Sequence, residues 1–295
     1  MEHITVLKQE AVQALALKPA SVVVDATLGA GGHGALILRA LGADGTYIGI
    51  DADPSAIAGV RPILSGTATI HLVEANFADI SSVLDSLGIL TVDAILADLG
   101  WRTDQFTEKG RGFSFADTDG LAMTFGNQDT YAFTAEEIVN EWDEADIANV
   151  LYGYGEEHYS RMIARAIVAF RKHSRITNAA TLAQIISDAV PSKYRNGRIH
   201  PATKSFQGLR IAVNDEFEKL ETFIAVAFDR LAAGGRLAII SFHSLEDRIV
   251  KQAFRALTHD QQGVLVSKKP VVASAEELKD NPRARSAKLR VIQKL

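Results

Sequence analysis

Short apolar runs alternate with amphipathic stretches through the first hundred residues of the chain. Four runs rich in β-branched and other apolar residues predict strands at residues 21–25, 46–51, 69–74 and 92–98. Helical spacing predicts a helix over residues 35–41, and Pro54 is placed to begin another. Because strands separated by helices form parallel β-α-β units, this part of the chain predicts a doubly wound sheet.

The middle of the chain predicts helices and no strand. Thr134 and Glu137 have the spacing of a capping box, which indicates a helix start. Apolar residues with helical spacing predict further helices over residues 156–172 and 178–190, the second ended by Pro191. This segment is typical of a helical insertion.

Strand signals return in the last third. Apolar positions from Leu209 to Leu231 recur every three or four residues, which predicts one long helix that starts near Pro201 and ends at Gly234 and Gly235. A strand over residues 236–242 follows, then a helix capped by Ser244, and a last strand at 289–293 paired with one within 264–272. We therefore predict an α/β fold with a doubly wound, mostly parallel sheet and an all-helical insertion domain. The predicted domains are residues 1–105 and 200–295 for the sheet and 106–199 for the insertion.

Composition narrows the class of protein. The 295 residues are 47% hydrophobic and include no cysteine, so the chain can bury a core and has neither disulfides nor thiolate metal sites. Neither a secretory signal nor a membrane span is visible, which predicts a cytoplasmic protein without membrane contact. No metal site is predicted, and the oligomeric state, monomer or homodimer, stays open.

Charge is unevenly distributed although the net charge is only -5. Between His158 and Asn214 ten basic residues face a single acid, Asp188. Such segregation suits a face that contacts a phosphate backbone, although each residue alone is more simply a solvated one. The basic residues are Arg161, Arg165, Arg171, Lys172, Arg175, Lys193, Arg195, Arg198, Lys204 and Arg210.

A glycine-rich loop follows the first predicted strand and precedes a helix. Residues 29–34 read Gly-Ala-Gly-Gly-His-Gly, which fits the G-x-G-x-x-G pattern of nucleotide-binding turns, where Gly29 and Gly31 let a ligand approach the backbone. Asp51, at the end of the second strand, is placed to accept the hydroxyls of a ribose, or else to cap the helix at Pro54. The pattern alone fits S-adenosylmethionine and NAD equally well.

Acids at two other strand ends favour S-adenosylmethionine. Asp25 precedes the glycines, where a carboxylate can bind an ammonium group but would repel a pyrophosphate. Asp98 ends the fourth strand, from which a carboxylate can reach the methyl acceptor, so it is the candidate catalytic residue. Each could instead be a turn-forming aspartate.

Motifs along nearly the whole chain resemble those of one family. They include D-A-T-L-G-A-G-G-H-G (25–34), I-G-I-D-A-D-P (48–54), A-D-L-G (97–100), R-G-F-S-F (111–115), Y-G-E-E (154–157), H-P-A-T-K-S-F-Q (200–207), G-G-R-L-A-I-I-S-F-H-S-L-E-D-R-I-V-K (234–251) and N-P-R-A-R-S-A-K-L-R (281–290). The set resembles the bacterial RsmH (MraW) family, the 16S rRNA cytosine-N4 methyltransferases. The resemblance implies a class I, Rossmann-like methyltransferase that acts on a cytidine near the decoding centre of the small ribosomal subunit.

The resemblance also implies roles for individual residues. Gly31, Gly32 and His33 would line the cofactor and Asp51 would hold its ribose. Phe77 would pack on the adenine, while Asp98 and Gln105 would lie near the methionine end. On the RNA side we expect the following residues: Trp101, Arg111, Phe113, Lys193, Arg195, Arg198, His200, Lys204 and Arg210. Trp101 and Phe113 could stack on the target base or simply anchor their loops.

The chain departs from the family pattern at three places. Near the N-terminus the family's H-x-P-V-L is His3-Ile4-Thr5-Val6-Leu7, and the other two departures lie on loops expected to face the methyl acceptor. Residues 101–104 replace a small proline-containing turn, and Ala122 and Thr124 stand where an aspartate and an arginine are expected. These departures leave open a cofactor-binding, RNA-binding ribosome-assembly factor that transfers no methyl group. The glycine pattern alone leaves open an NAD-dependent oxidoreductase, although no hydride-transfer constellation follows the fourth strand. His243 and Ser244 with the neighbouring acids do not indicate a hydrolase, because a Ser-x-x-Asp sequence after a strand is typical of a helix start.

Overall fold

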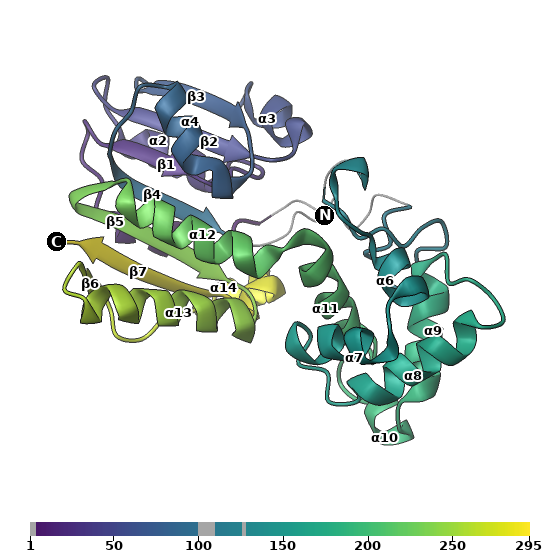
Figure 1. Cartoon of the computed structure of the whole chain (residues 1–295). Coiled ribbons are helices and arrows are strands. Elements are labelled where there is room, and N and C mark those ends of the chain that lie inside the picture. Colours follow the sequence, from purple (N-terminus) through teal and green to yellow (C-terminus); the bar gives the residue numbers. More distant parts are fainter. Residues whose placement is uncertain (1–3, 100–109, 126–127) are drawn as a thin grey trace. The chain divides into compact units, whose positions relative to one another are not determined.

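The computed structural model describes residues 4–99, 110–125 and 128–295 (Figure 1). The chain divides into two compact units. We name Met1–Gly100 together with Phe217–Leu295 the sheet unit, and Trp101–Glu216 the helical unit. The domain limits predicted from the sequence, at residues 105 and 199, differ from the limits of these units and remain a prediction.

The sheet unit contains one seven-stranded sheet with the strand order β3-β2-β1-β4-β5-β7-β6. Its strands are β1 (Val22–Asp25), β2 (Thr46–Asp51), β3 (Thr69–Glu74), β4 (Val92–Asp98), β5 (Leu231–Ser241), β6 (Gly263–Leu265) and β7 (Lys288–Lys294). The first five pair in parallel, whereas β7 pairs antiparallel with both β5 and β6. The predicted doubly wound, mostly parallel, Rossmann-like methyltransferase sheet is confirmed, including the late pairing of β6 with β7.

Apolar residues on both faces of this sheet form two hydrophobic clusters. Val23 packs with Ile37 of α2 in one cluster, whereas its neighbour Val24 packs with Leu84 and Phe223 in the other. Successive side chains of a strand point to opposite faces, so a buried parallel strand is apolar at every position. The helices of this unit are α1 (Lys8–Ala14), α2 (Gly32–Ala40), α3 (Pro54–Val60), η1 (Phe77–Asp79), α4 (Ile80–Ser86), α12 (Glu216–Asp229), α13 (Ser244–His259), α14 (Glu277–Asp280) and η3 (Pro282–Ser286).

The described part of the helical unit holds helices around its own core and no strand. They are η2 (Gln128–Thr130), α6 (Ala135–Glu141), α7 (Glu144–Gly153), α8 (Ser160–Arg171), α9 (Ala179–Ala189), α10 (Ser192–Arg195) and α11 (Thr203–Asn214). Thr134 and Glu137 form the predicted capping box of α6. Among the described residues, no helix has the length and apolar character needed to cross a membrane.

The single long helix predicted from Pro201 is wrong, because Asp215 divides it into α11 and α12. Asp215 has a φ of 49°, a left-handed conformation that aspartate tolerates better than most residues. The side chain of Asn214 donates to the carbonyls of Arg210 and Met123 and accepts from the amide of Phe125. The end of α11 is thus bound to the 121–125 loop, a contact that hydrophobic spacing cannot reveal.

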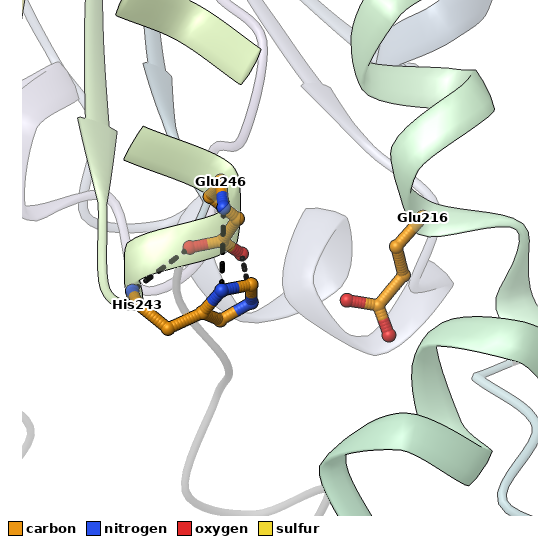
Figure 2. Close-up of side chains that lie close together, drawn as sticks. All are labelled: Glu216, His243 and Glu246. Atoms are coloured by element: carbon orange, nitrogen blue, oxygen red, sulfur yellow. Dashed lines mark hydrogen bonds and ion pairs between the residues drawn. The ribbon is translucent and has the colours of Figure 1, made fainter. Parts of the chain in front are cut away.

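Two predicted boundaries after α12 are also wrong. Gly234 and Gly235 do not end the helix; they lie within β5, where the pairing with β4 shifts register and Gly234 has a φ of 80°. Between Leu231 and Arg236 the strand is irregular, and a glycine with positive φ suits such a place. The helix cap of α13 is His243 and not Ser244: His243 Nδ1 accepts the amide of Glu246, whose carboxylate accepts the amide of His243 (Figure 2).

The acid of the same Ser-x-x-Asp sequence serves the strands rather than the cap. Asp247, one turn into α13, accepts hydrogen bonds from Lys288 and Arg290 of β7. Burial raises the pKa of Asp247, but the hydrogen bonds from Arg290 and Lys288 outweigh it, so the net pKa is lowered. This ion cluster fastens α13 to the sheet.

Candidate functional site

Three aspartates lie at the carboxyl edge of the parallel sheet. Asp25 ends β1, Asp51 ends β2 and Asp98 ends β4, and these strands are neighbours. The carboxyl ends of parallel strands meet at one edge, where doubly wound sheets bind their ligands. The geometry therefore brings the three predicted acids to a single edge.

The glycine-rich loop joins β1 to the first turn of α2 and is held by Asp51. Asp51 Oδ2 accepts the amide of Gly29 at 2.8 Å, and Oδ1 accepts the amide of Asp53 at 2.9 Å. The cap of α3 is Asp53, which accepts the amide of Ser55, so Asp51 is not that cap. A Cβ at Gly29 would meet only a backbone oxygen, 3.8 Å away, so this part of the loop is open to a ligand.

The other glycines of the loop are required by the protein itself, Gly31 by its backbone conformation and Gly32 and Gly34 by neighbouring side chains. Gly31 has a φ of 74°, and a Cβ at Gly32 would overlap the side chain of Thr5. A Cβ at Gly34 would overlap the phenol oxygen of Tyr47 and lie 3.0 Å from its Cζ. Neither Thr5 nor Tyr47 is visible as a site residue in the sequence, because each contact depends on the folded chain.

Asp25 is buried and its hydroxyl partner is Tyr47, whose Oη donates to Oδ2 at 3.0 Å. Burial raises the pKa of Asp25 to about 6, which the hydrogen bond from Tyr47 partly opposes. Oδ1 of Asp25 has no hydrogen-bond partner among the described residues. A buried, unsatisfied carboxylate oxygen suits a cationic ligand group and opposes a phosphate, so this edge fits S-adenosylmethionine better than NAD.

His33 connects the glycine loop with Asp98. Its Nε2 lies 3.1 Å from the carbonyl oxygen of Val6, and its Nδ1 lies 3.9 Å from Asp98 Oδ2. The amide of Asp98 donates to Thr27 Oγ1 at 2.6 Å, and its side chain is 18% exposed. Asp98 is therefore fixed through its backbone and still partly open to solvent, unlike the buried Asp25.

Phe77 begins the short η1 helix after β3. Its ring packs edge to face against Phe223 of α12, with 5.2 Å between centroids, and it is half-buried. Its predicted place against an adenine remains a prediction. Gln105 and Trp101, together with the changed turn at 101–104, lie outside the described residues.

The residues predicted to contact RNA from the helical unit divide into two groups. Arg111 donates to the carbonyl of Phe125, and Phe113 is buried and stacks on the Phe125 ring, 5.6 Å away. These contacts favour the anchoring role that the sequence left open for Phe113. Arg210 forms a two-bond ion pair with Glu216 at 2.8 and 2.9 Å.

The second group lies around the exposed α10 turn. Lys193, Arg195 and Arg198 are exposed, although Arg195 also pairs with Asp188 at 3.8 Å. His200 stacks on Phe115 at 4.4 Å. Lys204, which follows this turn, donates to the carbonyl of Glu156 at 3.0 Å.

A buried carboxylate that the sequence did not single out holds this turn. Glu157 is fully buried, and its Oε2 accepts the hydroxyl of Tyr194 of α10 at 2.7 Å. Its Oε1 accepts the amide of Tyr159. The Y-G-E-E motif therefore anchors the basic turn. The sequence gives no signal for this role, because the burial of Glu157 and its bond to Tyr194 are visible only in the folded chain.

Comparison with known proteins agrees with the geometry. The model of the MraW methylase family matches residues 1–295. A Synechocystis protein described as ribosomal RNA small subunit methyltransferase H is 46% identical over 299 residues, which cover 99% of this chain and 93% of the relative. A Trichodesmium erythraeum protein with the same description is 44% identical over 296 residues, with 100% of both chains covered.

Solved structures give a weaker likeness. An rRNA methylase from Streptococcus thermophilus aligns with a TM-score of 0.46 at 14% identity, over 100% of this chain and 99% of the other. A methyltransferase homologue from Pyrococcus horikoshii aligns with a TM-score of 0.47 at 14% identity, over 99% and 68%. On the match of its whole length, the chain belongs to the MraW methylase family.

Proposed function

We propose that this chain is an S-adenosylmethionine-dependent methyltransferase whose substrate is small-subunit ribosomal RNA and whose acceptor atom is the exocyclic N4 of a cytidine near the decoding centre. One observation carries the proposal: at the carboxyl edge of the sheet, the open glycine loop follows β1 and Asp98 ends the neighbouring strand β4. Family membership over residues 1–295 supports the chemistry, and the relatives' description supports the RNA.

The residues of the loop would hold the cofactor. The open backbone at Gly29 would contact it, and Asp51 would accept its ribose hydroxyls while keeping the loop in place through the Gly29 amide. Asp25 would attract its ammonium group. The cofactor, when bound, supplies an electrophilic methyl group on a sulfonium, so the protein's own task is to align the acceptor nitrogen.

Asp98 would orient and deprotonate that acceptor. The N4 lone pair of cytosine is delocalised into the ring, so a carboxylate that accepts an N4 hydrogen would localise it and ease loss of the proton. The bond from its amide to Thr27 fixes the backbone of Asp98, and His33 lies 3.9 Å from its carboxylate. Such positioning is what a reaction controlled by alignment requires.

The exposed basic turn of the helical unit would contact phosphates. Lys193, Arg195 and Arg198 are exposed, and Glu157 anchors their turn through Tyr194. Phosphate contacts give affinity without sequence specificity and weaken as salt rises. Because the proposed substrate is ribosomal RNA, we propose that the protein acts in the cytoplasm, with the small ribosomal subunit as its partner.

Nucleoside mass spectrometry tests the proposal. rRNA from cells with and without the gene is digested, and N4-methylcytidine is measured in the small-subunit fraction. We expect the mark to be lost without the gene, to return with the unmodified gene and the exposed-site control Asp44→Ala, and to stay absent with Asp98→Ala.

The outcomes separate the alternatives. An unchanged level of N4-methylcytidine would refute the methyltransferase proposal. If the mark is unchanged while the purified chain binds S-adenosylhomocysteine and small subunits, the chain is an assembly factor without transfer activity. Normal turnover by Asp98→Ala would refute the role of Asp98 alone.

A further inference from the structure

The N-terminal residues 4–7 lie directly against the glycine loop of the sheet unit. A Cβ placed on Gly32 would overlap Thr5 Oγ1, lie 2.9 Å from Thr5 Cβ and lie 3.2 Å from Thr5 Cγ2. Gly32 begins α2 without a positive φ, so its backbone would accept alanine. Thr5, rather than backbone conformation, therefore makes a glycine necessary at this position.

The same segment holds the side chain that follows. His33 is buried, and its Nε2 lies 3.1 Å from the carbonyl oxygen of Val6. Because a carbonyl oxygen only accepts, the proton of this contact is on Nε2. Nδ1 of the same ring lies 3.9 Å from Asp98 Oδ2, so Val6 orients a ring that borders the candidate catalytic carboxylate.

Residues from the other end of the chain fasten the segment. Glu277 of α14 accepts the amide of Leu7 at 2.7 Å, and Asn281 donates from Nδ2 to the carbonyl of Ile4 at 3.1 Å. Leu7 is fully buried and has a left-handed φ of 48°. The two hydrogen bonds bridge 270 and 277 positions of sequence.

We infer that residues 4–7, fastened by Glu277 and Asn281, are a clasp that sets the affinity of the glycine loop for its cofactor. The clasp residues are positioning residues: they act through Gly32 and His33. A loop already held in its binding conformation loses less entropy when a ligand binds, so loosening the clasp weakens binding. The inference rests on the proposed function, because it takes S-adenosylmethionine as the ligand.

The first experiment removes the hydrogen bond between Glu277 and the amide of Leu7. Glu277→Ala removes the acceptor for Leu7, Glu277→Gln keeps an acceptor oxygen, and Glu276→Ala changes an exposed neighbour on the same turn. Calorimetry with S-adenosylhomocysteine measures the dissociation constant, and steady-state kinetics measure KM and kcat. Hydrogen exchange of the ligand-free protein reports the amides at the start of α2.

We expect Glu277→Ala to raise the dissociation constant and the KM for S-adenosylmethionine by about 10-fold, with kcat at saturation and the KM for the RNA substrate unchanged. Exchange at the start of α2 should accelerate. Glu277→Gln should recover most of the affinity, and Glu276→Ala should match the unmodified chain. Lower kcat at an unchanged dissociation constant would indicate a structural role only and would overturn the inference.

The second experiment does not depend on the stability of Glu277→Ala. Gly32→Ala should weaken S-adenosylhomocysteine binding, and adding Thr5→Gly should restore it by removing the overlapping side chain. If the double variant binds as poorly as Gly32→Ala, the ligand and not Thr5 requires the glycine, and the inference is refuted. If the unmodified chain does not bind S-adenosylhomocysteine, the proposed function fails and the inference with it.

Discussion

The buried carboxyl of Asp25 predicts that cofactor binding releases a proton near pH 6. Burial raises the pKa of Asp25 from its ordinary value of 3.8 to about 6. Between these values the folded protein holds a proton that the unfolded chain has lost, so ionisation destabilises the ligand-free fold as the pH rises. The shift of about two pH units corresponds to about 3 kcal/mol at pH 7, lost mainly between about pH 4 and about pH 6.

A cationic ligand group beside Asp25 reverses this effect. The ammonium group of S-adenosylhomocysteine lowers the pKa of the carboxyl and so stabilises its charged form. At a pH equal to the free pKa half of the molecules carry the proton, so binding at pH 6 should release about 0.5 proton per ligand. At pH 7.5 Asp25 is ionised before binding, and almost no proton should be released.

Calorimetry at pH 6 in two buffers with different ionisation enthalpies measures the released proton. Asp25→Asn has no proton to lose at this position, so its release should fall to that of the remaining groups, whereas the exposed-site control Asp44→Asn should behave as the unmodified chain. Equal release from the unmodified chain and Asp25→Asn would refute the reasoning.

Three further predictions concern contacts within the helical unit or within the sheet unit. Tyr194→Phe removes a hydrogen bond to the buried Glu157 and should cost about 1–3 kcal/mol, measured by thermal unfolding of the helical unit. Asp247 has a lowered pKa, so the stability it contributes should be complete above about pH 4 and be lost as the pH falls through its folded pKa, as an acid titration of the unmodified chain against Asp247→Asn would show. Gly34→Ala should destabilise the sheet unit, and Tyr47→Phe should relieve part of that loss, since the removed hydroxyl is the atom overlapped.

Each of the three has an outcome that contradicts it. The exposed Tyr152→Phe is the control for Tyr194→Phe, and equal melting temperatures of the two would show that the buried hydrogen bond adds nothing. Parallel acid unfolding curves for Asp247→Asn and the unmodified chain would remove the ion cluster from the stability argument. Additive losses in Gly34→Ala combined with Tyr47→Phe would show that the two positions do not interact.

The parallel half of the sheet was predictable because its signal is local. β1, β2, β3 and β4 are apolar runs that end in acids or turns, and the structure has each of them within a residue of its predicted place. The errors arose where tertiary contacts overrule spacing. Asn214 ends α11 by bonding to backbone far away in the sequence, although the apolar repeat continues through Asp215. The register shift in β5 similarly contains two glycines whose pattern indicates a helix end.

Among the candidate site residues, too, those with a local signal were predictable and those that depend on long-range contacts were not. Asp51 and Asp98 were predictable because an acid at the end of a parallel strand necessarily lies at the binding edge. Thr5, Tyr47 and Glu277 were not, because each acts on the loop through a contact between distant parts of the sequence. A glycine motif indicates where another group approaches the backbone closely. Only the fold shows whether that group is a ligand or a side chain of the protein.

The glycines of the loop make the same point chemically. Only Gly29 faces open space, whereas Gly32 and Gly34 leave room for side chains of the protein itself. Gly34, one of the three glycines of the G-x-G-x-x-G pattern, thus carries no information about a phosphate. The choice of cofactor depends instead on charge, and the buried carboxyl of Asp25 beside the loop, whose Oδ1 lacks a partner among the described residues, is the group that a pyrophosphate could not approach. Replacing that carboxyl should therefore alter cofactor affinity more than replacing any single glycine that packs against the protein.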